Sequence, residues 1–256
     1  MIGQPAMSGI LYAAVKRVVD ATASGLGLLL LSPVLLAFAA AVWLHDFRSP
    51  LYVAERVGRG GVLFRMVKLR SMTVRADRTG IDSTAADDRR ITAVGRILRA
   101  YKMDELSQLW NVFVGDMSLV GPRPNVPREV DLYTKDEREL LSVRPGITDL
   151  SSIVFSDEGE ILAGRPDPDL AYHQLIRPWK SRLGLLYVQH RSMSLDVELI
   201  LLTLVAIVAR GRALAGVQRV LARLGAPEDL RQAARRETPL TPYPPPGSDT
   251  IVTARA

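Results

Sequence analysis

The sequence predicts an α+β, mainly helical fold with a re-entrant N-terminal membrane helix, a small β-hairpin and interfacial amphipathic helices around one main domain. Three observations lead to this prediction: a long uncharged run near the N-terminus, two β-prone runs on either side of a glycine-rich turn, and helical periodicity through most of the remaining chain. With 256 residues, the chain is long enough to bury one good hydrophobic core.

The first predicted element is the uncharged run at residues 21–44, ATASGLGLLLLSPVLLAFAAAVWL. It is long enough to cross the roughly 30 Å hydrocarbon layer as one helix. Ser32 and Pro33 stand at its midpoint. A proline inside a helix removes one backbone hydrogen bond and kinks the helix, and a serine hydroxyl can satisfy the carbonyl that is left free. Each arm then extends roughly 18 Å, which is too short to span the layer, so we expect re-entry.

The charges beside this run indicate its topology. Basic residues precede the run and follow it closely, and positive charge at both ends is the bias of a cytoplasmic face. We therefore expect residues 1–15 to form an N-terminal segment and residues 16–46 to enter and leave from that face. A signal peptide is disfavoured because the run exceeds the roughly 7–15 apolar residues of such signals. A single-pass anchor stays open, since charge on both sides weakens the orientation without forbidding a crossing.

The next predicted element is a β-hairpin over residues 51–70, LYVAERVGRGGVLFRMVKLR. The glycine-rich stretch at residues 58–61 is a turn signal between two β-prone runs. Period-two alternation places Phe64, Met66 and Lys68 on one side of the second strand. A polar stretch without sustained apolar periodicity follows the hairpin and predicts a mobile loop.

Helical patterning then begins near Ile91 and returns over residues 105–113, with Gly115 as a C-terminal cap. The charged run at residues 128–141 indicates a helix with a solvated face. Residues 199–209 are apolar for too few positions to span a membrane, which suits a core or interfacial helix.

The C-terminal region predicts one more helix and a tail. Residues 214–224 carry an apolar stripe with arginines on the remaining surface, so this helix either lies on anionic lipid or packs on the domain. The proline-rich stretch from Gly225 onward predicts disorder. We therefore divide the chain after the membrane helix into a main domain at residues 47–210 and an amphipathic helix with a disordered tail at residues 211–256.

The composition narrows the classes of partner and of site. The formal net charge of +6 indicates an anionic partner, which could be nucleic acid, a membrane surface or a phosphorylated substrate. The absence of cysteine excludes disulfides, thiolate nucleophiles and cysteine zinc sites. The three histidines are widely spaced, which argues against a histidine metal site.

Two adjacent acids, Asp104 and Glu105, open the stretch DELSQLWNVFVGD. Neighbours in a helix point about 100° apart, so these acids cannot form one carboxylate dyad and must do different jobs. Asp104 also suits the N-cap of the following helix, a structural role that would explain it alone. A catalytic role is favoured by the number of side chains near the pair that can bind phosphate: Lys68, Arg70, Arg96, Arg99, Arg123 and Arg144.

Arg123 stands between Pro122 and Pro124, whose rings fix the backbone and present a planar guanidinium to a phosphate. Two carboxylates among cations suggest phosphoryl transfer with a divalent cation, because Mg²⁺ prefers oxygen ligands and is commonly bound by carboxylates and substrate phosphates together. An ionised aspartate can also attack phosphorus and form an aspartyl phosphate. The sequence contains neither a Walker-type phosphate loop nor a GxGxxG motif that opens a helix.

The motifs, in their order, resemble those of bacterial sugar transferases, the monotopic phosphoglycosyl transferases. The resemblance covers roughly residues 12–210 and is carried by KRVVD, LLLLSPVLLA, ERVGRGGVLFRMVKLRSM, DRRITAVGRILR, MDELSQLWNVFVGDMSLVGPRP and RPGIT. It implies transfer of a sugar 1-phosphate from a UDP-sugar to polyprenyl (undecaprenyl) phosphate, with release of UMP. This reaction is the first membrane step of surface-glycan biosynthesis, at the cytoplasmic face of the bacterial inner membrane.

The resemblance also implies the roles of individual residues. Asp104 matches the nucleophile that forms a covalent phosphosugar intermediate, Glu105 helps to hold Mg²⁺ beside it, and Ser32 with Pro33 matches the break of the re-entrant helix. The residues expected to meet phosphates or the nucleotide are Lys68, Arg99, Pro122, Arg123, Pro124 and Arg144. The implied partners are the nucleotide sugar, polyprenyl phosphate, inner-membrane lipids and downstream glycosyltransferases.

The chain departs from the common family pattern at Met103, Ser107 and Asp149, changes that keep both acids but leave the sugar open. The membrane-spanning region that some relatives carry ahead of this domain does not precede it here, so we expect a minimal catalytic form. Two rival classes are disfavoured. A nucleic-acid-binding protein is disfavoured because this sequence contains no recognisable DNA-reading helix and no aromatic-basic motif. An inactive membrane scaffold for glycan enzymes is disfavoured because it would not need the intact acids and the GPRP motif.

Overall fold

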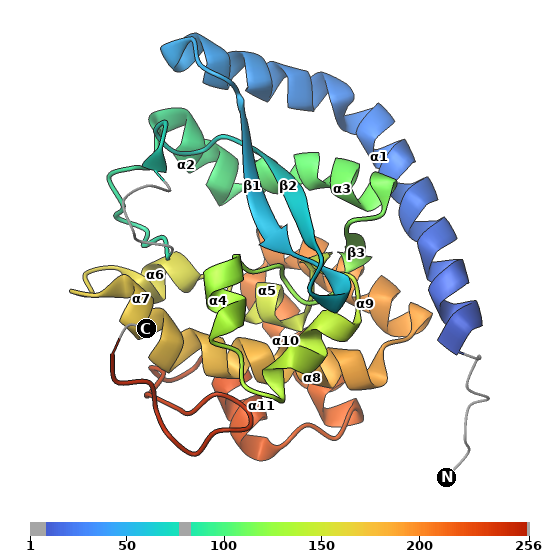
Figure 1. Ribbon diagram of the computed structural model, residues 1–256, viewed down its shortest axis with the longest axis vertical. Helices are drawn as coiled ribbons and strands as arrows, with labels where there is room; N and C mark the ends of the chain where they lie inside the picture. Colours follow the sequence, from blue (N-terminus) through green and yellow to red (C-terminus); the bar gives the residue numbers. More distant parts are fainter. Residues whose placement is uncertain (1–8, 77–82, 255–256) are drawn as a thin grey trace.

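The computed structural model describes residues 9–76 and 83–254, and it confirms a mainly helical α+β protein with a small hairpin. Figure 1 shows a long N-terminal helix that runs along one side of the molecule and across one end. The hairpin crosses the front of a domain that is otherwise built from shorter helices. Part of the predicted loop after the hairpin lies outside the described residues.

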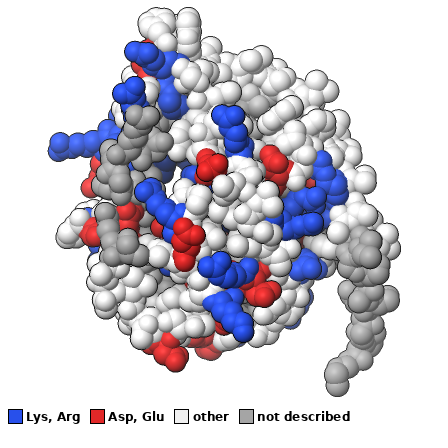
Figure 2. All heavy atoms as spheres, viewed as in Figure 1, with Lys and Arg blue, Asp and Glu red and all other residues white. Residues whose placement is uncertain are grey.

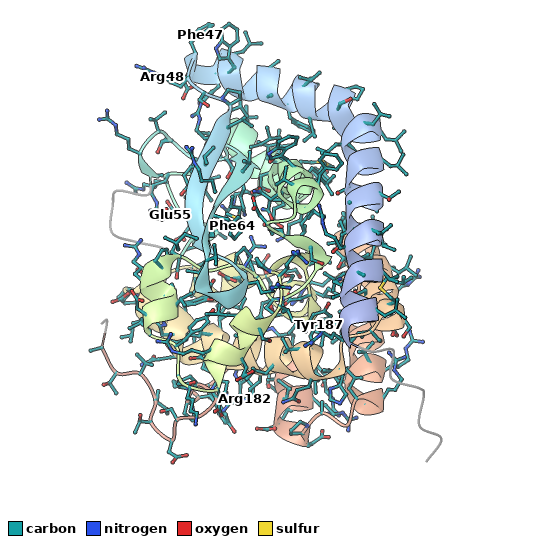
Figure 3. The ribbon with its side chains drawn as sticks, turned by 45° about the vertical axis from the view of Figure 1, so that its right-hand side comes forward. Phe47, Arg48, Glu55, Phe64, Arg182 and Tyr187 are labelled. Carbon is teal, nitrogen blue, oxygen red and sulfur yellow. The ribbon has the colours of Figure 1, made fainter. Side chains whose placement is uncertain are left out.

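Helix α1 (Gly9–Asp46) is continuous over 38 residues and contains Pro33 in its interior. The proline cannot donate to the carbonyl of Leu29, and the Ser32 hydroxyl donates to that carbonyl instead, at 2.8 Å. Figure 3 shows the helix turning sharply between its two arms. By length and composition, Leu11–Asp46 is the one helix of the described chain that could cross a membrane. The predicted break is therefore a bend inside a single helix.

The predicted hairpin is confirmed by strands β1 (Leu51–Val57) and β2 (Leu63–Leu69), which pair antiparallel along their whole length. In the turn, Gly60 has φ of 69°, a left-handed conformation that favours glycine. Phe64 and Met66 are buried in a small core beneath the hairpin, as the period-two alternation predicts.

The acids lie in the segment that follows. Helix α2 (Ala93–Ala100) leads through Lys102, which has a left-handed φ of 57°, into the 3₁₀ helix η3 (Met103–Gln108). Helix α3 (Leu109–Val114) continues directly and ends at the predicted cap Gly115, with φ of 101°. The predicted helix at this place thus begins as a tighter 3₁₀ turn, which changes the direction of the acids relative to the α-helix.

Two short parallel strands, β3 (Ser118–Val120) and β4 (Gly146–Thr148), form a second sheet that the sequence did not predict. Between them lie α4 (Pro127–Asp131) and the 3₁₀ helix η4 (Glu137–Ser142). The prediction of one charged helix at residues 128–141 is therefore wrong, because the segment is divided.

The prediction of a solvated face for that segment is wrong as well. Glu137 is fully buried. Its Oε1 accepts hydrogen bonds from Arg177 Nε at 3.0 Å and from Ser181 Oγ at 2.7 Å, and its Oε2 accepts from Arg177 Nη2 at 2.5 Å. A buried carboxylate needs such partners, and both come from the helix that packs on η4.

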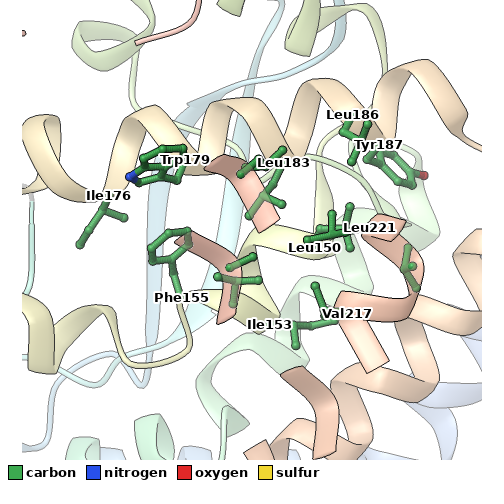
Figure 4. Close-up of a cluster of buried hydrophobic side chains, with 14 of the residues drawn as sticks. Leu150, Ile153, Phe155, Ile176, Trp179, Leu183, Leu186, Tyr187, Val217 and Leu221 are labelled. Carbon is green, nitrogen blue, oxygen red and sulfur yellow. The ribbon is translucent and has the colours of Figure 1, made fainter. Parts of the chain in front are cut away.

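From β4 to residue 254, the regular structure is entirely helical. Its elements are α5 (Leu150–Val154), α6 (Glu158–Leu162), α7 (Pro168–Ala171), the π-helical turn η5 (Tyr172–Ile176), α8 (Arg177–His190), α9 (Met193–Val208), α10 (Arg210–Arg223) and α11 (Glu228–Arg235). Figure 4 shows their apolar side chains meeting in the main hydrophobic core, where Leu150, Leu183 and Leu221 are fully buried.

The structure decides between the two alternatives for the helix at residues 214–224. The apolar stripe of α10 is buried in the main core through Val217 and Leu221, so this helix packs on the domain and shares a core with residues before 211. The prediction of a disordered tail is wrong over the described length. Tyr243 stacks on Trp179 with ring centroids 4.3 Å apart, and the Val252 carbonyl accepts a hydrogen bond from the Gln174 side chain.

Helix α9 has a different surface, with one side in the main core and the other exposed. Leu195 and Leu199 are buried, whereas Leu201, Leu204 and Val208 are exposed. The predicted segment at residues 199–209 is therefore both a core helix and a source of exposed apolar surface.

Candidate active site

A cavity with a volume of about 1990 Å³ brings together five of the predicted site residues: Lys68, Arg99, Asp104, Glu105 and Arg123. We call it the central cavity. Ligand pockets usually measure roughly 300–1,000 Å³, so this cavity has room for more than one substrate. Figure 2 shows charged side chains of both signs gathered over the middle of the face that carries the hairpin.

The 3₁₀ helix that carries the acids is tied to strand β2. The Asn111 side chain donates to the Arg65 carbonyl at 2.7 Å and accepts from the Val67 N–H at 2.9 Å. The Ser107 hydroxyl donates to the Val67 carbonyl at 3.2 Å. These bonds fix the helix against the strand and thereby set Lys68 beside the acids.

Glu105 is the paired member of the two acids. Its Oε1 accepts from Lys68 Nζ at 3.2 Å and from Arg123 Nη2 in a short hydrogen bond. Burial alone would raise the pKa of Glu105, but the charges of Arg123 and Lys68 outweigh burial and hold the pKa well below its ordinary value. Glu105 is therefore ionised, and its Oε2 accepts no hydrogen bond from the described residues.

Asp104 is the unpaired member. Its side chain lines the central cavity and is 6% exposed, and no side chain or N–H in the described ranges donates to its carboxylate. Burial raises its pKa, Lys68 opposes that rise, and the neighbouring charge of Glu105 adds to it. The predicted N-cap role is wrong, because Lys102 occupies the cap and Asp104 lies inside the 3₁₀ helix. A buried carboxylate without a partner is a candidate nucleophile.

The two predicted cations on the same side of the cavity lie where they can act on the acids. Burial lowers the pKa of Lys68, and the charge of Glu105 opposes this effect. Arg99 comes from the last turn of α2, and its charge lowers the pKa of Asp104. Both side chains supply positive charge beside a cavity that contains two carboxylates.

The GPRP loop is fixed by backbone contacts with the RPG motif. Gly121 N–H donates to the Thr148 carbonyl and Gly146 N–H donates to the Pro122 carbonyl, each at 3.0 Å. A Cβ on Gly146 would lie 2.1 Å from the Gly121 nitrogen, so the loops approach this closely only because both residues are glycine. This contact holds the backbone that carries Arg123, whose pKa is raised chiefly by Glu105.

The other predicted binding residues lie elsewhere. Pro122 and Pro124 are buried and do not line the central cavity, so they position Arg123 rather than border the ligand space. Arg144 also lies outside it and donates from Nε to the Gly115 carbonyl at 2.9 Å. The backbone of Arg144 meets the GPRP loop while its side chain lines a second cavity, and its contact with a phosphate stays a prediction.

Sequence reasoning missed a second ion pair in the lining of the central cavity. Lys180 Nζ forms a short contact with Glu158, and both side chains line the cavity. Burial would raise the pKa of Glu158, but Lys180 and then Arg123 lower it below its ordinary value. The acidic run SDEGE was a visible signal for Glu158, whereas nothing local to Lys180 marked it as a partner.

The acids fit a divalent cation. No group of three or more metal-ligating side chains occurs in the described residues. Mg²⁺, however, is commonly held by one or two carboxylates together with water and substrate phosphates. The Asp104 carboxylate and the Oε2 atom of Glu105 are oxygen donors of that kind, and neither is occupied by a hydrogen bond from the described protein.

The central cavity also has an apolar wall next to the acids. It is formed by η3, α3, the two parallel strands and α9, through Leu106, Leu109, Leu119, Ile147, Ile200, Leu204 and Ile207. Leu204 and Ile207 are exposed, so this wall continues onto the exposed side of α9. One cavity therefore offers charged groups for phosphates and an apolar surface for a hydrocarbon.

Comparisons with known proteins cover all of these residues. The model of a family described as bacterial sugar transferase matches residues 11–210. The UDP-glucose:undecaprenyl-phosphate glucose-1-phosphate transferase of Caulobacter vibrioides is 39% identical over 172 residues, which is 64% of each chain. The exopolysaccharide production protein ExoY of Rhizobium meliloti is 33% identical over 207 residues, 75% of this chain and 84% of the relative.

A third relative is longer. The undecaprenyl-phosphate galactose phosphotransferase of Salmonella typhimurium is 32% identical over 213 residues, which is 77% of this chain and 41% of the relative. The chain therefore spans less than two thirds of the length of the Caulobacter protein and less than half of the Salmonella protein.

Proposed function

Because this chain belongs to the bacterial sugar transferase family, we propose that it transfers a sugar 1-phosphate from a UDP-sugar to undecaprenyl phosphate. The reaction releases UMP and starts surface-glycan assembly. The observation that carries this proposal is the unpaired, buried carboxylate of Asp104, next to the ionised Glu105 in a cavity lined by phosphate-competent cations. Names of relatives support the acceptor, since two of them contain undecaprenyl phosphate.

The reaction has two balanced steps. In the first, an oxygen of Asp104 attacks the β-phosphorus of the UDP-sugar, the bond from that phosphorus to the bridging oxygen breaks, and UMP leaves with the electron pair. In the second, a phosphate oxygen of the undecaprenyl phosphate attacks the same phosphorus, and the Asp104 oxygen leaves as the free carboxylate. The product carries the sugar through a diphosphate, and Asp104 is regenerated.

The cations of the cavity would bind the phosphates during both steps. Arg123 can exchange its contact with Glu105 for two donor phosphate oxygens, because a guanidinium presents a planar pair of N–H groups. Lys68 and Arg99 add charge on the side of Asp104. Asp104 and Glu105 would hold Mg²⁺, which when bound neutralises phosphate charge.

The apolar wall of the central cavity suits the isoprenoid chain of the acceptor. The wall lies beside the acids and continues to the exposed apolar side of α9, so a lipid could enter with its phosphate pointing inward. Burying hydrocarbon against such a surface is favourable at roughly 25 cal/mol per Å². An exposed helix side of this kind also suits the membrane interface.

We further propose that α1 enters and leaves the inner membrane from the cytoplasmic face. The proposal is supported by Pro33 and Ser32 within the bend and by basic residues at both ends of the helix. Single cysteines at Ala14 and Ser49 should both resist an impermeant thiol reagent applied to intact cells. Labelling of Ala14→Cys alone would indicate a true span and would contradict re-entry.

The experiment that tests the function combines turnover with capture of the intermediate. Purified protein, Mg²⁺ and undecaprenyl phosphate are offered a panel of UDP-sugars, and UMP release identifies the accepted donor. With that donor and no acceptor lipid, the peptide that contains Asp104 should gain the mass of one phosphosugar. An adduct on Glu105 would reverse the roles of the acids, and no UMP release with any donor would contradict the proposal.

A further inference from the structure

A second, smaller cavity of about 90 Å³ lies outside the central cavity. Five segments distant in the sequence form it: α1, the turn of the hairpin, strand β3, the end of η4 with the linker to β4, and the end of α8 with the linker that follows it. Its volume exceeds the roughly 10–15 Å³ that one water molecule needs and is far below the roughly 300–1,000 Å³ of drug-sized ligand pockets. The cavity therefore suits a compact group such as a phosphate. We call it the arginine cavity.

Its lining has an excess of positive charge. Four cations line it, namely Lys16, Arg59, Arg144 and Arg191, against the single carboxylate of Asp20. Lys16 is neutralised from outside the lining by Asp196, with Nζ and Oδ2 2.6 Å apart. The three arginines form no ion pair with any residue that the structure describes.

The one lining carboxylate does not neutralise these arginines by direct contact. Asp20 is buried, and its Oδ1 accepts the N–H of Leu119 at 3.2 Å. The Arg59 side chain donates to no described residue, and the Arg191 side chain donates to the Val188 carbonyl and to no other described residue. Two guanidinium groups thus border the cavity without an ion pair to any carboxylate in residues 9–76 and 83–254.

Arg144 carries the clearest sign of uncompensated charge. Burial lowers its pKa, and the like charges of Arg59 and Arg17 lower it further, with Asp20 in opposition. Its Nε donates to the Gly115 carbonyl, but its two terminal nitrogens donate to no described residue. Repulsion of this kind is costly in a partly buried place, and an anion bound between the guanidinium groups would offset it.

The surroundings favour a lipid as the source of that anion. The same first turns of α1 that contribute Lys16 also expose Leu11, Val15, Val18 and Val19. An apolar helix surface beside a cationic cavity matches a phospholipid, whose phosphate lies next to its acyl chains. A soluble phosphate would use the cavity but not this apolar surface.

We propose that the arginine cavity is a second phosphate-binding site, separate from the central cavity, and that it takes the phosphate of an anionic membrane phospholipid. Arg59, Arg144 and Arg191 bind the phosphate from three directions, and the acyl chains lie along the start of α1. Bound in this way, the lipid links α1 to the hairpin turn and to the start of α9.

The test counts phospholipids on the purified full-length protein by native mass spectrometry, with phosphatidylglycerol or phosphatidylcholine added to the detergent. Arg59→Gln/Arg191→Gln removes two charges from exposed side chains and leaves the packing intact. Arg212→Gln/Arg219→Gln removes two exposed charges from α10 and is the matched control. Loss of charge-assisted contacts should weaken phosphatidylglycerol binding roughly tenfold or more in the first variant and leave the control unchanged.

Three outcomes decide the proposal. Equal phosphatidylglycerol binding by both variants and the wild type would overturn it. Equal preference for phosphatidylcholine in the wild type would overturn the anionic lipid as ligand. If millimolar inorganic phosphate displaces the lipid and protects the wild type but not Arg59→Gln/Arg191→Gln against heat, the site binds phosphate from a soluble source. UMP release by that variant in detergent should equal that of the wild type, which separates this site from catalysis.

Discussion

The central cavity and the cluster around Glu137 both contain a glutamate held by an arginine, yet the two clusters differ in what they leave free. Glu137 is enclosed, and Arg177 and Ser181 use both of its oxygens. Within the part of the chain that the structure describes, Glu105 accepts hydrogen bonds at one carboxylate oxygen only, and the carboxylate of the adjacent Asp104 accepts none. A fully satisfied buried pair fixes the fold, whereas a half-satisfied pair at a cavity keeps oxygens available for a ligand.

The largest effect expected from this contrast is a variant that loses catalytic activity and keeps its fold. Asp104→Asn should lower UMP release by at least roughly a thousandfold and abolish the covalent adduct, because an amide cannot attack phosphorus. A raised carboxyl pKa means that ionisation costs stability as the pH rises through it. Thermal unfolding at neutral pH should therefore show the variant to be no less stable than the wild type. Substantial residual turnover would contradict the nucleophile assignment.

The opposite pattern is expected at the enclosed cluster. Glu137→Gln leaves the buried Arg177 without its counter-charge, which should reduce the free energy of unfolding by roughly 3–5 kcal/mol. Denaturant unfolding measures this, while turnover of the fraction that remains folded should stay near the wild-type value. A double change, Glu137→Gln with Arg177→Met, should recover part of the loss. Unchanged stability in the single variant would contradict the claim that the cluster around Glu137 stabilises the fold.

A smaller effect is expected where charge is kept but geometry is lost. Arg123→Lys should lower kcat/KM for the nucleotide sugar roughly ten- to a hundredfold, because an ammonium group cannot form the paired contact of a guanidinium from a fixed loop. Arg138→Lys, a change at an exposed position of η4 outside the lining of the central cavity, is the control. If both variants keep full activity, Arg123 acts only as a general positive charge.

The smallest expected effect is a shift in pH dependence. Asp104 attacks only when it is ionised, and its pKa lies above the ordinary value of 3.8. As the pH is lowered, the rate of adduct formation should therefore begin to decline before the pH reaches 3.8. Lys68 lowers this pKa, and Lys68→Met should therefore move the acid limb to higher pH. Lys180→Met, which changes a cation that is paired with Glu158 and does not contribute to the raised pKa of Asp104, should leave the limb in place. Single-turnover rates across a pH series measure both shifts.

Local sequence patterns were sufficient to predict those features of the structure that depend on residues close together in the sequence. Alternation in the second strand predicted the burial of Phe64 and Met66, and the density of cations predicted that Lys68, Arg99 and Arg123 would join the acids. Each of these follows from a period or a motif that can be read within a few residues.

Long-range pairing explains what could not be predicted. The partner of Glu137 lies 40 residues away on α8, so a charged segment that looked solvated is in fact buried. Strands β3 and β4 have three residues each, too few to show a period, and their pairing decides that Arg123 and Arg144 point into different cavities. The order of the tail depends on the contact of Tyr243 with a tryptophan from α8, which proline content cannot indicate.

The side chain of Asn111 has a consequence beyond the placement of the acids. The outer edge of a two-stranded sheet presents free N–H and C=O groups that can recruit a strand from another molecule. Asn111 covers that edge of β2 by satisfying the Arg65 carbonyl and the Val67 N–H. The side-chain amide that positions the acids therefore also protects this strand edge from aggregation. A variant without it should be prone to intermolecular strand addition while the protein is being synthesised.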